Sequence, residues 1–155
     1  MEVYRIAQEK FAADLSGNGA RLYGGRWNSE GSFALYTASS RSLALLETLA
    51  HSSADLLRFN TYMLVTLFIP SAIKPEKMEG RQLPKGWDSY DDLTASRKKG
   101  DLFLQKKKNL LLAVPSVQVP EEWNYLLNPL HPDMAIVKLI HQRRVLFDKR
   151  TVGHI

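Results

Sequence analysis

The chain has no cysteine among its 155 residues. Disulfide frameworks, zinc sites built on thiolates and cysteine nucleophiles are therefore excluded, and a reducing compartment is the simplest assumption. The sequence also lacks an apolar run approaching the roughly 20 residues of a membrane-spanning helix. Its first residues include Glu2, Arg5, Glu9 and Lys10, whereas a signal peptide would have an uninterrupted apolar segment. We expect a cytoplasmic protein without a membrane contact.

The composition is that of one ordinary globular domain, with 45% hydrophobic and 24% charged residues. No repeat, low-complexity segment or linker divides the chain, so we expect a single domain over residues 1–155. The net charge of +5 favours ligands that carry phosphate, which could be a nucleic acid or a nucleotide, and it equally favours an acidic protein partner.

Hydrophobic periodicity predicts a fold with more strands than helices. The segment from about residue 8 to residue 32 has five glycines and no periodicity, so we expect a long loop there. Ser39, Ser40 or Ser42 can cap the first helix, and Gly100 can interrupt the second. Because helices and strands do not alternate regularly, the α+β class is favoured. The expected strands are 2–7, 33–38, 62–69, 110–114, 117–119, 135–140 and 145–147, and the expected helices are 43–51 and 91–108.

The glycine-rich segment does not match the common phosphate-binding loops. A dinucleotide fingerprint beginning at Gly17 would need a third glycine where Leu22 stands, and no Gly-Lys-Ser/Thr sequence of a P-loop occurs. The segment does offer Arg21 and Arg26 among small residues. These arginines could bind phosphate oxygens or could simply be solvated.

Glu47 is the most informative single residue, because it falls on an apolar face of the predicted helix. A carboxylate there is costly to bury unless it is paired or hydrogen-bonded, so it is a member of a structural ion pair or a site residue. The residues expected on the same face are Leu43, Ala44, Ala50 and His51.

Three further residue types could take part in chemistry. Tyr36 could present its ring to a planar ligand or belong to the core. Ser116 lacks the flanking glycines of a nucleophile elbow. The histidines do not have the spacing of a helical zinc site, so no metal is expected. They are His51, His131, His141 and His154.

Basic residues are concentrated in the second predicted helix, at residues 97–99 and 106–108. The apolar residues 102–104 lie between the two clusters. This arrangement is typical of an amphipathic helix that faces a partner, or of a solvated surface helix.

Taken together, the motifs resemble the RES domain family, which is named for its Arg, Glu and Ser. The resemblance extends from Tyr4-Arg5 to the segment Asn124–Asp133, and so spans nearly the whole chain. The strings that carry it are Gly25-Arg26-Trp27-Asn28-x-x-Gly31, Leu35-Tyr36-x-Ala38, Ala44-Leu45-Leu46-Glu47 and Val114-Pro115-Ser116.

This resemblance implies a fold similar to the ADP-ribosyltransferase domains of diphtheria-type toxins, with a mostly antiparallel sheet and peripheral helices. It implies a bacterial toxin that consumes NAD⁺ as its substrate and needs no prosthetic group. The matching site residues are Arg26 for the NAD⁺ phosphates, Tyr36 near the nicotinamide, Glu47, and Ser116 as a hydrogen-bond donor to the ribose or nicotinamide, with Arg5 and Asn28 as further NAD⁺ contacts.

The residue types suit this chemistry. Breaking the nicotinamide–ribose bond builds positive charge on the sugar, and a fixed carboxylate such as Glu47 can stabilise that charge. Nicotinamide leaves as a neutral base, so no general acid is required. The acceptor stays open: water and phosphate give NAD⁺ degradation, and a protein side chain gives mono-ADP-ribosylation.

The resemblance also implies a cognate antitoxin with an Xre-like helix-turn-helix region. Because this sequence has no convincing helix-turn-helix of its own, DNA would be contacted only through that antitoxin. A homodimer within the toxin–antitoxin complex is compatible with this arrangement. The alternative from another class is a basic nucleic-acid-binding module, which would need exposed aromatic residues on a basic face.

Overall fold

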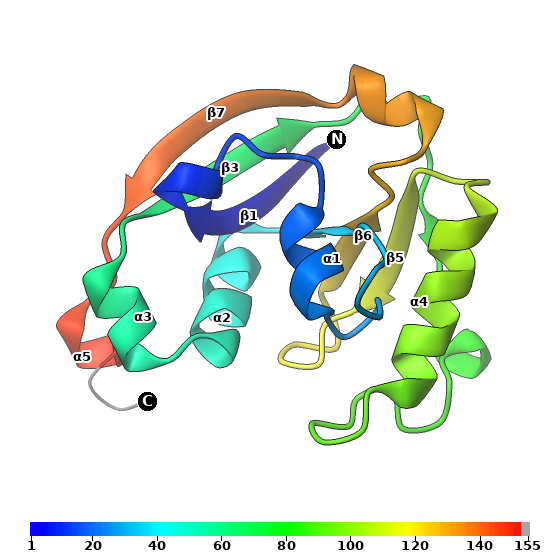
Figure 1. Ribbon diagram of the computed structural model, residues 1–155, viewed down its shortest axis with the longest axis horizontal. Helices are drawn as coiled ribbons and strands as arrows, with labels where there is room; N and C mark the ends of the chain where they lie inside the picture. The colour runs from blue at the N-terminus through cyan, green and yellow to red at the C-terminus, as the bar shows by residue number, and fades with distance from the viewer. Residues whose placement is uncertain (153–155) are drawn as a thin grey trace.

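The computed structural model describes residues 1–152, and these residues form one curved seven-stranded sheet with helices around it (Figure 1). The spatial order of the strands is β4-β5-β6-β2-β1-β3-β7. The strands are β1 (Glu2–Gln8), β2 (Leu35–Ala38), β3 (Tyr62–Phe68), β4 (Glu76–Lys77), β5 (Leu111–Pro115), β6 (Trp123–Leu127) and β7 (Lys138–Val145).

The helices are short, apart from two that pack on the sheet. The α-helices are α1 (Asn18–Tyr23), α2 (Arg41–His51), α3 (Ala54–Phe59), α4 (Thr94–Lys106) and α5 (Lys149–Val152). The 3₁₀ helices are η1 (Glu9–Phe11), η2 (Gly80–Gln82) and η3 (Pro132–Ile136).

The sheet is antiparallel except where β4 pairs with β5. At its middle, β1 and β2 pair only weakly, and this place is the joint between the two halves of the sheet. Strand β1 pairs with β3 along its whole length, from Glu2 to Gln8. Its pairing with β2 consists of the single register pair Tyr4 and Ala38. The two halves of the sheet therefore diverge beyond this pair, and the space that opens between them is where the candidate site lies.

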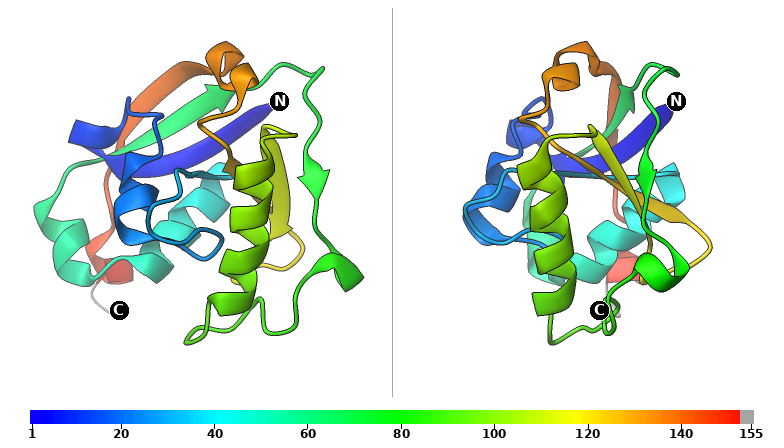
Figure 2. Two further views of the ribbon diagram at one scale, coloured as in Figure 1. Left: turned by 45° about the vertical axis from the view of Figure 1, so that its right-hand side comes forward. Right: turned by 90° about the vertical axis from the view of Figure 1, so that its right-hand side faces the viewer.

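Two helices cover the halves of the sheet separately, as the turned views show (Figure 2). Helix α2 lies on the joint, where its Leu43 and Ala44 pack with Tyr4 and Leu64. Helix α4 covers β5 and β6 through a second cluster, which contains Trp27, Phe103, Leu104, Leu112, Val114 and Leu126. The α+β prediction is confirmed, and the position of α2 brings Glu47 to the joint.

The first predicted helix and the strand 62–69 agree closely with the structure. Helix α2 begins at Arg41 because the Ser40 hydroxyl accepts a hydrogen bond from the backbone N–H of Leu43 at 3.0 Å, so Ser40 is the cap. Strand β3 covers Tyr62–Phe68. Its residues Val65 and Leu67 are fully buried, which explains the strong apolar pattern.

Several expectations about secondary structure were wrong. The glycine-rich segment is not one continuous loop, because η1 and α1 form within it. Residues 117–119 form a turn rather than a strand, and strand β6 lies in a segment for which no strand was predicted. The two strands expected at 135–140 and 145–147 are η3 followed by the single strand β7.

Helix α4 runs through Gly100 without the expected interruption. A Cβ atom at Gly100 would overlap the main-chain carbonyl of Trp27, so the glycine allows the 24–31 loop to pack directly on the helix. Within residues 1–152, no helix has both the length and the apolar character needed to cross a membrane.

Gly100→Ala is expected to destabilise the protein by about 2 kcal/mol. Alanine favours the helix by about 1 kcal/mol, but the clash is with main chain that cannot rotate away. Urea unfolding measures the difference, and Gly19→Ala is the control, because a Cβ at Gly19 would meet nothing within 4 Å. A Gly100→Ala protein as stable as wild type would contradict this packing.

Candidate active site

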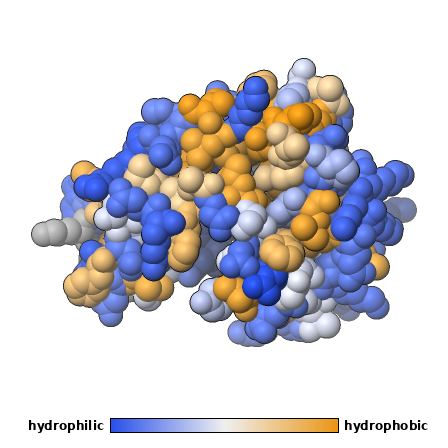
Figure 3. Space-filling view, turned by 45° about the horizontal axis from the view of Figure 1, so that its top comes forward, coloured by the Kyte–Doolittle hydropathy of each residue, from blue (hydrophilic) through white to orange (hydrophobic). Residues whose placement is uncertain are grey.

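A cavity of about 850 Å³ lies between the two halves of the sheet. This volume is within the usual range for small-molecule sites. Its walls come from β1, β2, α2, the segment 17–27 and the turn after β5, so residues far apart in the sequence face one another. The space-filling view shows a hollow bordered by both apolar and polar side chains (Figure 3).

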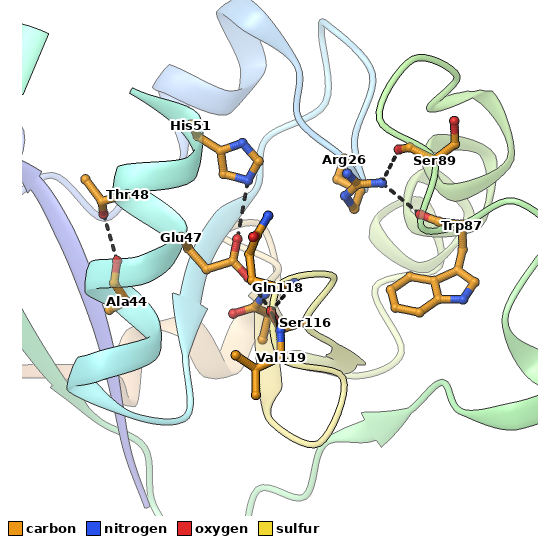
Figure 4. A network of polar contacts seen from close by, with 11 residues as sticks. Arg26, Ala44, Glu47, Thr48, His51, Trp87, Ser89, Ser116, Gln118 and Val119 are labelled. Carbon is orange, nitrogen blue, oxygen red and sulfur yellow. Dashed lines mark hydrogen bonds and ion pairs between the residues drawn. The ribbon is translucent and has the colours of Figure 1, made fainter. Parts of the chain in front are cut away.

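Glu47 lies on the cavity wall with its carboxylate held at both oxygens (Figure 4). Its Oε1 accepts hydrogen bonds from the Ser116 hydroxyl at 2.7 Å and from the Asn124 amide at 2.6 Å. Its Oε2 lies 3.3 Å from His51 Nε2. The side chain is 20% exposed, so the carboxylate is largely enclosed and still reaches the cavity.

The ionisation of Glu47 is set by two opposing effects. Burial disfavours the charged form, but the contacts from His51, Ser116 and Asn124 outweigh burial and hold the pKa of Glu47 below its ordinary value. Glu47 is therefore a carboxylate at neutral pH. It can stabilise positive charge or accept a hydrogen bond from a ligand hydroxyl.

Ser116 contacts Glu47 and not the cavity. It is fully buried, and its oxygen accepts hydrogen bonds from the backbone N–H groups of Gln118 at 3.0 Å and Val119 at 3.1 Å. A hydroxyl has one proton, and here that proton is donated to Glu47. The expected donation from Ser116 to the ribose or nicotinamide is thus corrected, because the structure gives Ser116 a positioning role.

Ser116→Ala is expected to lower the free energy of unfolding by about 1–3 kcal/mol, because it removes a buried hydroxyl that three groups use. Urea unfolding at pH 7 measures the loss, with the exposed Ser42→Ala as the control. The folded pKa of Glu47 lies below its unfolded value. At a pH above the unfolded pKa of Glu47, the network therefore stabilises the folded protein. This stabilisation is lost as the pH falls through the folded pKa.

The difference in stability between wild type and Ser116→Ala should accordingly shrink in acid. An equal difference at pH 7 and at pH 3 would show that Ser116 does not stabilise the ionised form of Glu47.

Arg26 lies across the cavity from Glu47 (Figure 4). Its Nη1 donates to the main-chain carbonyls of Trp87 at 2.9 Å and Ser89 at 2.7 Å. In the described part of the chain, its Nε and Nη2 make no hydrogen bond, and they remain available to an anionic ligand. The Arg26 side chain is thus fixed in place, and its Nε and Nη2 can still donate hydrogen bonds to a ligand.

Tyr36 lines the cavity and supports the loop that carries Arg26. Its hydroxyl accepts from the Trp27 N–H at 2.9 Å and donates to Asn28 Oδ1 at 2.8 Å. Burial raises the pKa of Tyr36 well above its ordinary value. A Cβ at Gly25 would lie 2.6 Å from this hydroxyl, so glycine is needed for the loop to rest on the tyrosine.

Asn28 does not reach the cavity, which corrects its expected contact with NAD⁺. It is fully buried, and its amide donates to three main-chain carbonyls while its Oδ1 accepts from Tyr36. Its side-chain amide is thus hydrogen-bonded within the 20–32 segment and to Tyr36 on β2. Asn28 therefore shapes the loop that presents Arg26.

Two more arginines line the cavity. Arg5 on β1 donates from Nη1 to the Asp14 carbonyl at 2.8 Å, and burial lowers its pKa from the ordinary value. Arg97 on α4 donates from Nε to the Gly25 carbonyl at 2.9 Å. The basic cluster at 97–99 is thus divided, with Arg97 on the cavity and Lys98 and Lys99 exposed.

Sequence reasoning missed several residues of this site. Asn124 fell in a segment for which no strand was predicted, although its side chain makes the shortest contact to Glu47. His51 was considered as a neighbour of Glu47 on the helix and as a metal ligand, but not as part of a network with Glu47. Tyr23 and Tyr90 also line the cavity and are 79% and 73% exposed, and nothing in the local sequence pattern distinguishes them from core tyrosines.

The described residues contain no group of three or more His, Asp or Glu side chains arranged to hold a metal ion. His131 is close to Asp133, at 3.8 Å, and His141 is exposed on β7. His154 lies outside the described residues.

Comparison with known proteins finds relatives that match most of this chain. A Prs ADP-ribosylating toxin from Sphingobium sp. (strain YBL2) is 43% identical over 143 residues, which are 91% of this chain and 88% of that protein. A Toxin Res from Photorhabdus laumondii is 36% identical, covering 86% of this chain and 85% of the relative. A Toxin Res from Pseudomonas putida is 38% identical, covering 82% and 86%.

A solved structure shares the fold. One chain of the crystal structure of the M. tuberculosis MbcT–MbcA toxin–antitoxin complex superimposes with a TM-score of 0.73. It matches over 93% of this chain and 83% of that chain, at 19% sequence identity. The family model described as the RES domain matches residues 2–148. This chain therefore belongs to the RES domain family.

Proposed function

We propose that this chain is the toxin of a bacterial toxin–antitoxin pair and that it acts by breaking the nicotinamide–ribose bond of NAD⁺. The observation that carries the proposal is the ionised Glu47 carboxylate, which Ser116, Asn124 and His51 fix on the wall of a cavity large enough for a dinucleotide. The relatives named Toxin Res and the toxin–antitoxin complex with the same fold support the biological role.

The proposed chemistry follows from the positions of the side chains. Arg26 would bind a phosphate oxygen with its free donors, and Arg5 and Arg97 would add positive charge to the same cavity. Glu47 would face the ribose and stabilise the positive charge that develops at C1′. Because Ser116 and Asn124 already fix Oε1, little reorganisation of the carboxylate is needed in the transition state.

The Tyr36 ring lines the same cavity, and its hydroxyl is fully used by Trp27 and Asn28. It would therefore meet the nicotinamide through its ring rather than through its hydroxyl. Nicotinamide departs with the bonding electron pair as a neutral base, so the site needs no general acid.

A second candidate function differs only in the acceptor. The relative with 43% identity is named a Prs ADP-ribosylating toxin, which favours transfer of ADP-ribose to a protein. Hydrolysis gives free ADP-ribose, phosphorolysis gives ADP-ribose-1″-phosphate, and transfer leaves ADP-ribose on a protein.

One experiment tests the proposal and separates these acceptors. Purified protein is incubated with NAD⁺ labelled in the adenosine half, alone, with phosphate and with cell lysate, and the products are identified by mass spectrometry. We expect label in a product of bond cleavage in at least one condition. Intact NAD⁺ in all three conditions would refute the proposal.

We further propose that the partner is an antitoxin with an Xre-like helix-turn-helix region, through which DNA is bound. The crystal structure with the same fold is a toxin–antitoxin complex, which supports an antitoxin as the partner. Co-purification of this chain with the product of the adjacent gene tests the pairing, and DNA binding by the toxin alone would contradict the indirect contact.

A further inference from the structure

His51 helps to hold Glu47 through one ring nitrogen, and the proposed cleavage step gives its other ring nitrogen no function. It lies on α2 one turn after Glu47, its imidazole lines the cavity, and its side chain is 62% exposed (Figure 4). Its Nε2 lies 3.3 Å from Glu47 Oε2. Anchoring of the carboxylate does not depend on this contact alone, because Ser116 and Asn124 hold the other oxygen.

The contact with Glu47 determines which nitrogen of His51 carries the proton. A carboxylate accepts hydrogen bonds, so the neutral imidazole places its proton on Nε2 and its lone pair on Nδ1. In the described part of the chain, Nδ1 makes no hydrogen bond. The result is an imidazole oriented by a carboxylate, with a basic nitrogen that is not engaged by the protein.

Asp14 and Thr48, which also line the cavity, are less suited to accept a proton. Asp14 is the other carboxylate on the wall, and its hydrogen bonds from Ser16 hold its pKa below the ordinary value. The Thr48 hydroxyl is used by the Ala44 carbonyl at 2.8 Å. Glu47 itself is the group expected to face the ribose.

We propose that His51 is the general base that activates the acceptor, an assignment that rests on the proposed NAD⁺ cleavage. The C1′–N1 bond breaks and its electron pair leaves with nicotinamide. The acceptor oxygen forms the new bond to C1′, and its proton passes to His51 Nδ1. The imidazolium that forms lies beside Glu47, whose negative charge stabilises it, and the proton is then released to water.

The test uses a nucleophile that has no proton to lose. His51→Ala is expected to slow nicotinamide release by about 100-fold or more with water as the acceptor. Added azide should restore the rate toward that of wild type and give ADP-ribosyl azide, identified by mass spectrometry. His141→Ala, an exposed histidine on β7 away from the cavity, is the control and should behave as wild type.

The outcomes separate this assignment from the proposed function. If wild type releases nicotinamide and His51→Ala keeps more than a tenth of the rate, His51 is not the base. Loss of rate that azide does not restore would also overturn the assignment, because the defect would then lie in bond cleavage or binding. If wild type releases no nicotinamide in any condition, the proposed function itself fails and this assignment fails with it.

Discussion

Replacing Glu47 by Gln is expected to slow nicotinamide release from NAD⁺ by about 10²–10³-fold. The substitution keeps the size of the side chain but removes the negative charge that would stabilise the ribosyl cation. It also replaces a carboxylate oxygen that accepts from both Ser116 and Asn124 by an amide, so part of the loss comes from a disturbed network. The KM for NAD⁺ should change less than kcat, because the charge acts mainly in the transition state.

A matched control is available nearby. Glu121→Gln changes the same charge at an exposed position away from the cavity and should retain full activity. Circular dichroism and urea unfolding would establish that Glu47→Gln is folded. A folded Glu47→Gln protein with at least a tenth of the wild-type rate would remove Glu47 from the mechanism.

Arg26→Ala is expected to raise the KM for NAD⁺ by about 10–100-fold, which corresponds to the loss of a charge-assisted contact to phosphate. Arg26→Lys should lie between Ala and wild type, because it keeps the charge but loses the planar donor fork. Steady-state kinetics of nicotinamide release measure both effects. Arg81→Ala, which removes an exposed arginine on η2, is the control and should leave the KM unchanged.

Arg26 also holds the carbonyls of Trp87 and Ser89, so its removal affects more than the ligand. Urea unfolding separates the two contributions, because a purely structural role would lower stability and leave the KM of the folded enzyme intact. An Arg26→Ala protein with a wild-type KM would contradict the phosphate contact.

The elements with strong local signals were predictable from sequence. Strand β3 is buried on both faces, and α2 begins with a serine cap, so both patterns are set by nearby residues. Strand β7 was divided in the prediction because its centre is polar. It lies at the edge of the sheet with most side chains exposed, where charge is compatible with a strand.

Strand β6 shows the limit of local reasoning. It has Asn124 near its start and no regular alternation, and it is a strand because it pairs with β2 and β5, which are distant in sequence. The local sequence pattern therefore could not predict β6. The segment 117–119, Val-Gln-Val, alternates as a short strand would, but it is a turn because the Ser116 hydroxyl accepts hydrogen bonds from the backbone N–H groups of Gln118 and Val119.

The candidate site could be predicted only in part, for a related reason. Glu47 was identified as a carboxylate on an apolar face, and the family resemblance pointed to Arg26 and Tyr36. The network around Glu47 joins residues 69 and 77 positions apart in sequence, so no spacing rule could reveal that Ser116 and Asn124 meet at one oxygen. The same resemblance placed Asn28 at the ligand, whereas the fold buries it beneath the loop.

The most direct measurement of the central claim is the release of nicotinamide from NAD⁺ labelled in the nicotinamide ring, with purified wild-type protein and with lysate present to supply protein acceptors. The account predicts release of free nicotinamide well beyond the uncatalysed rate, whichever acceptor takes the ADP-ribose. If the label stays in intact NAD⁺ with lysate and phosphate both supplied, the cavity at Glu47 does not perform this chemistry.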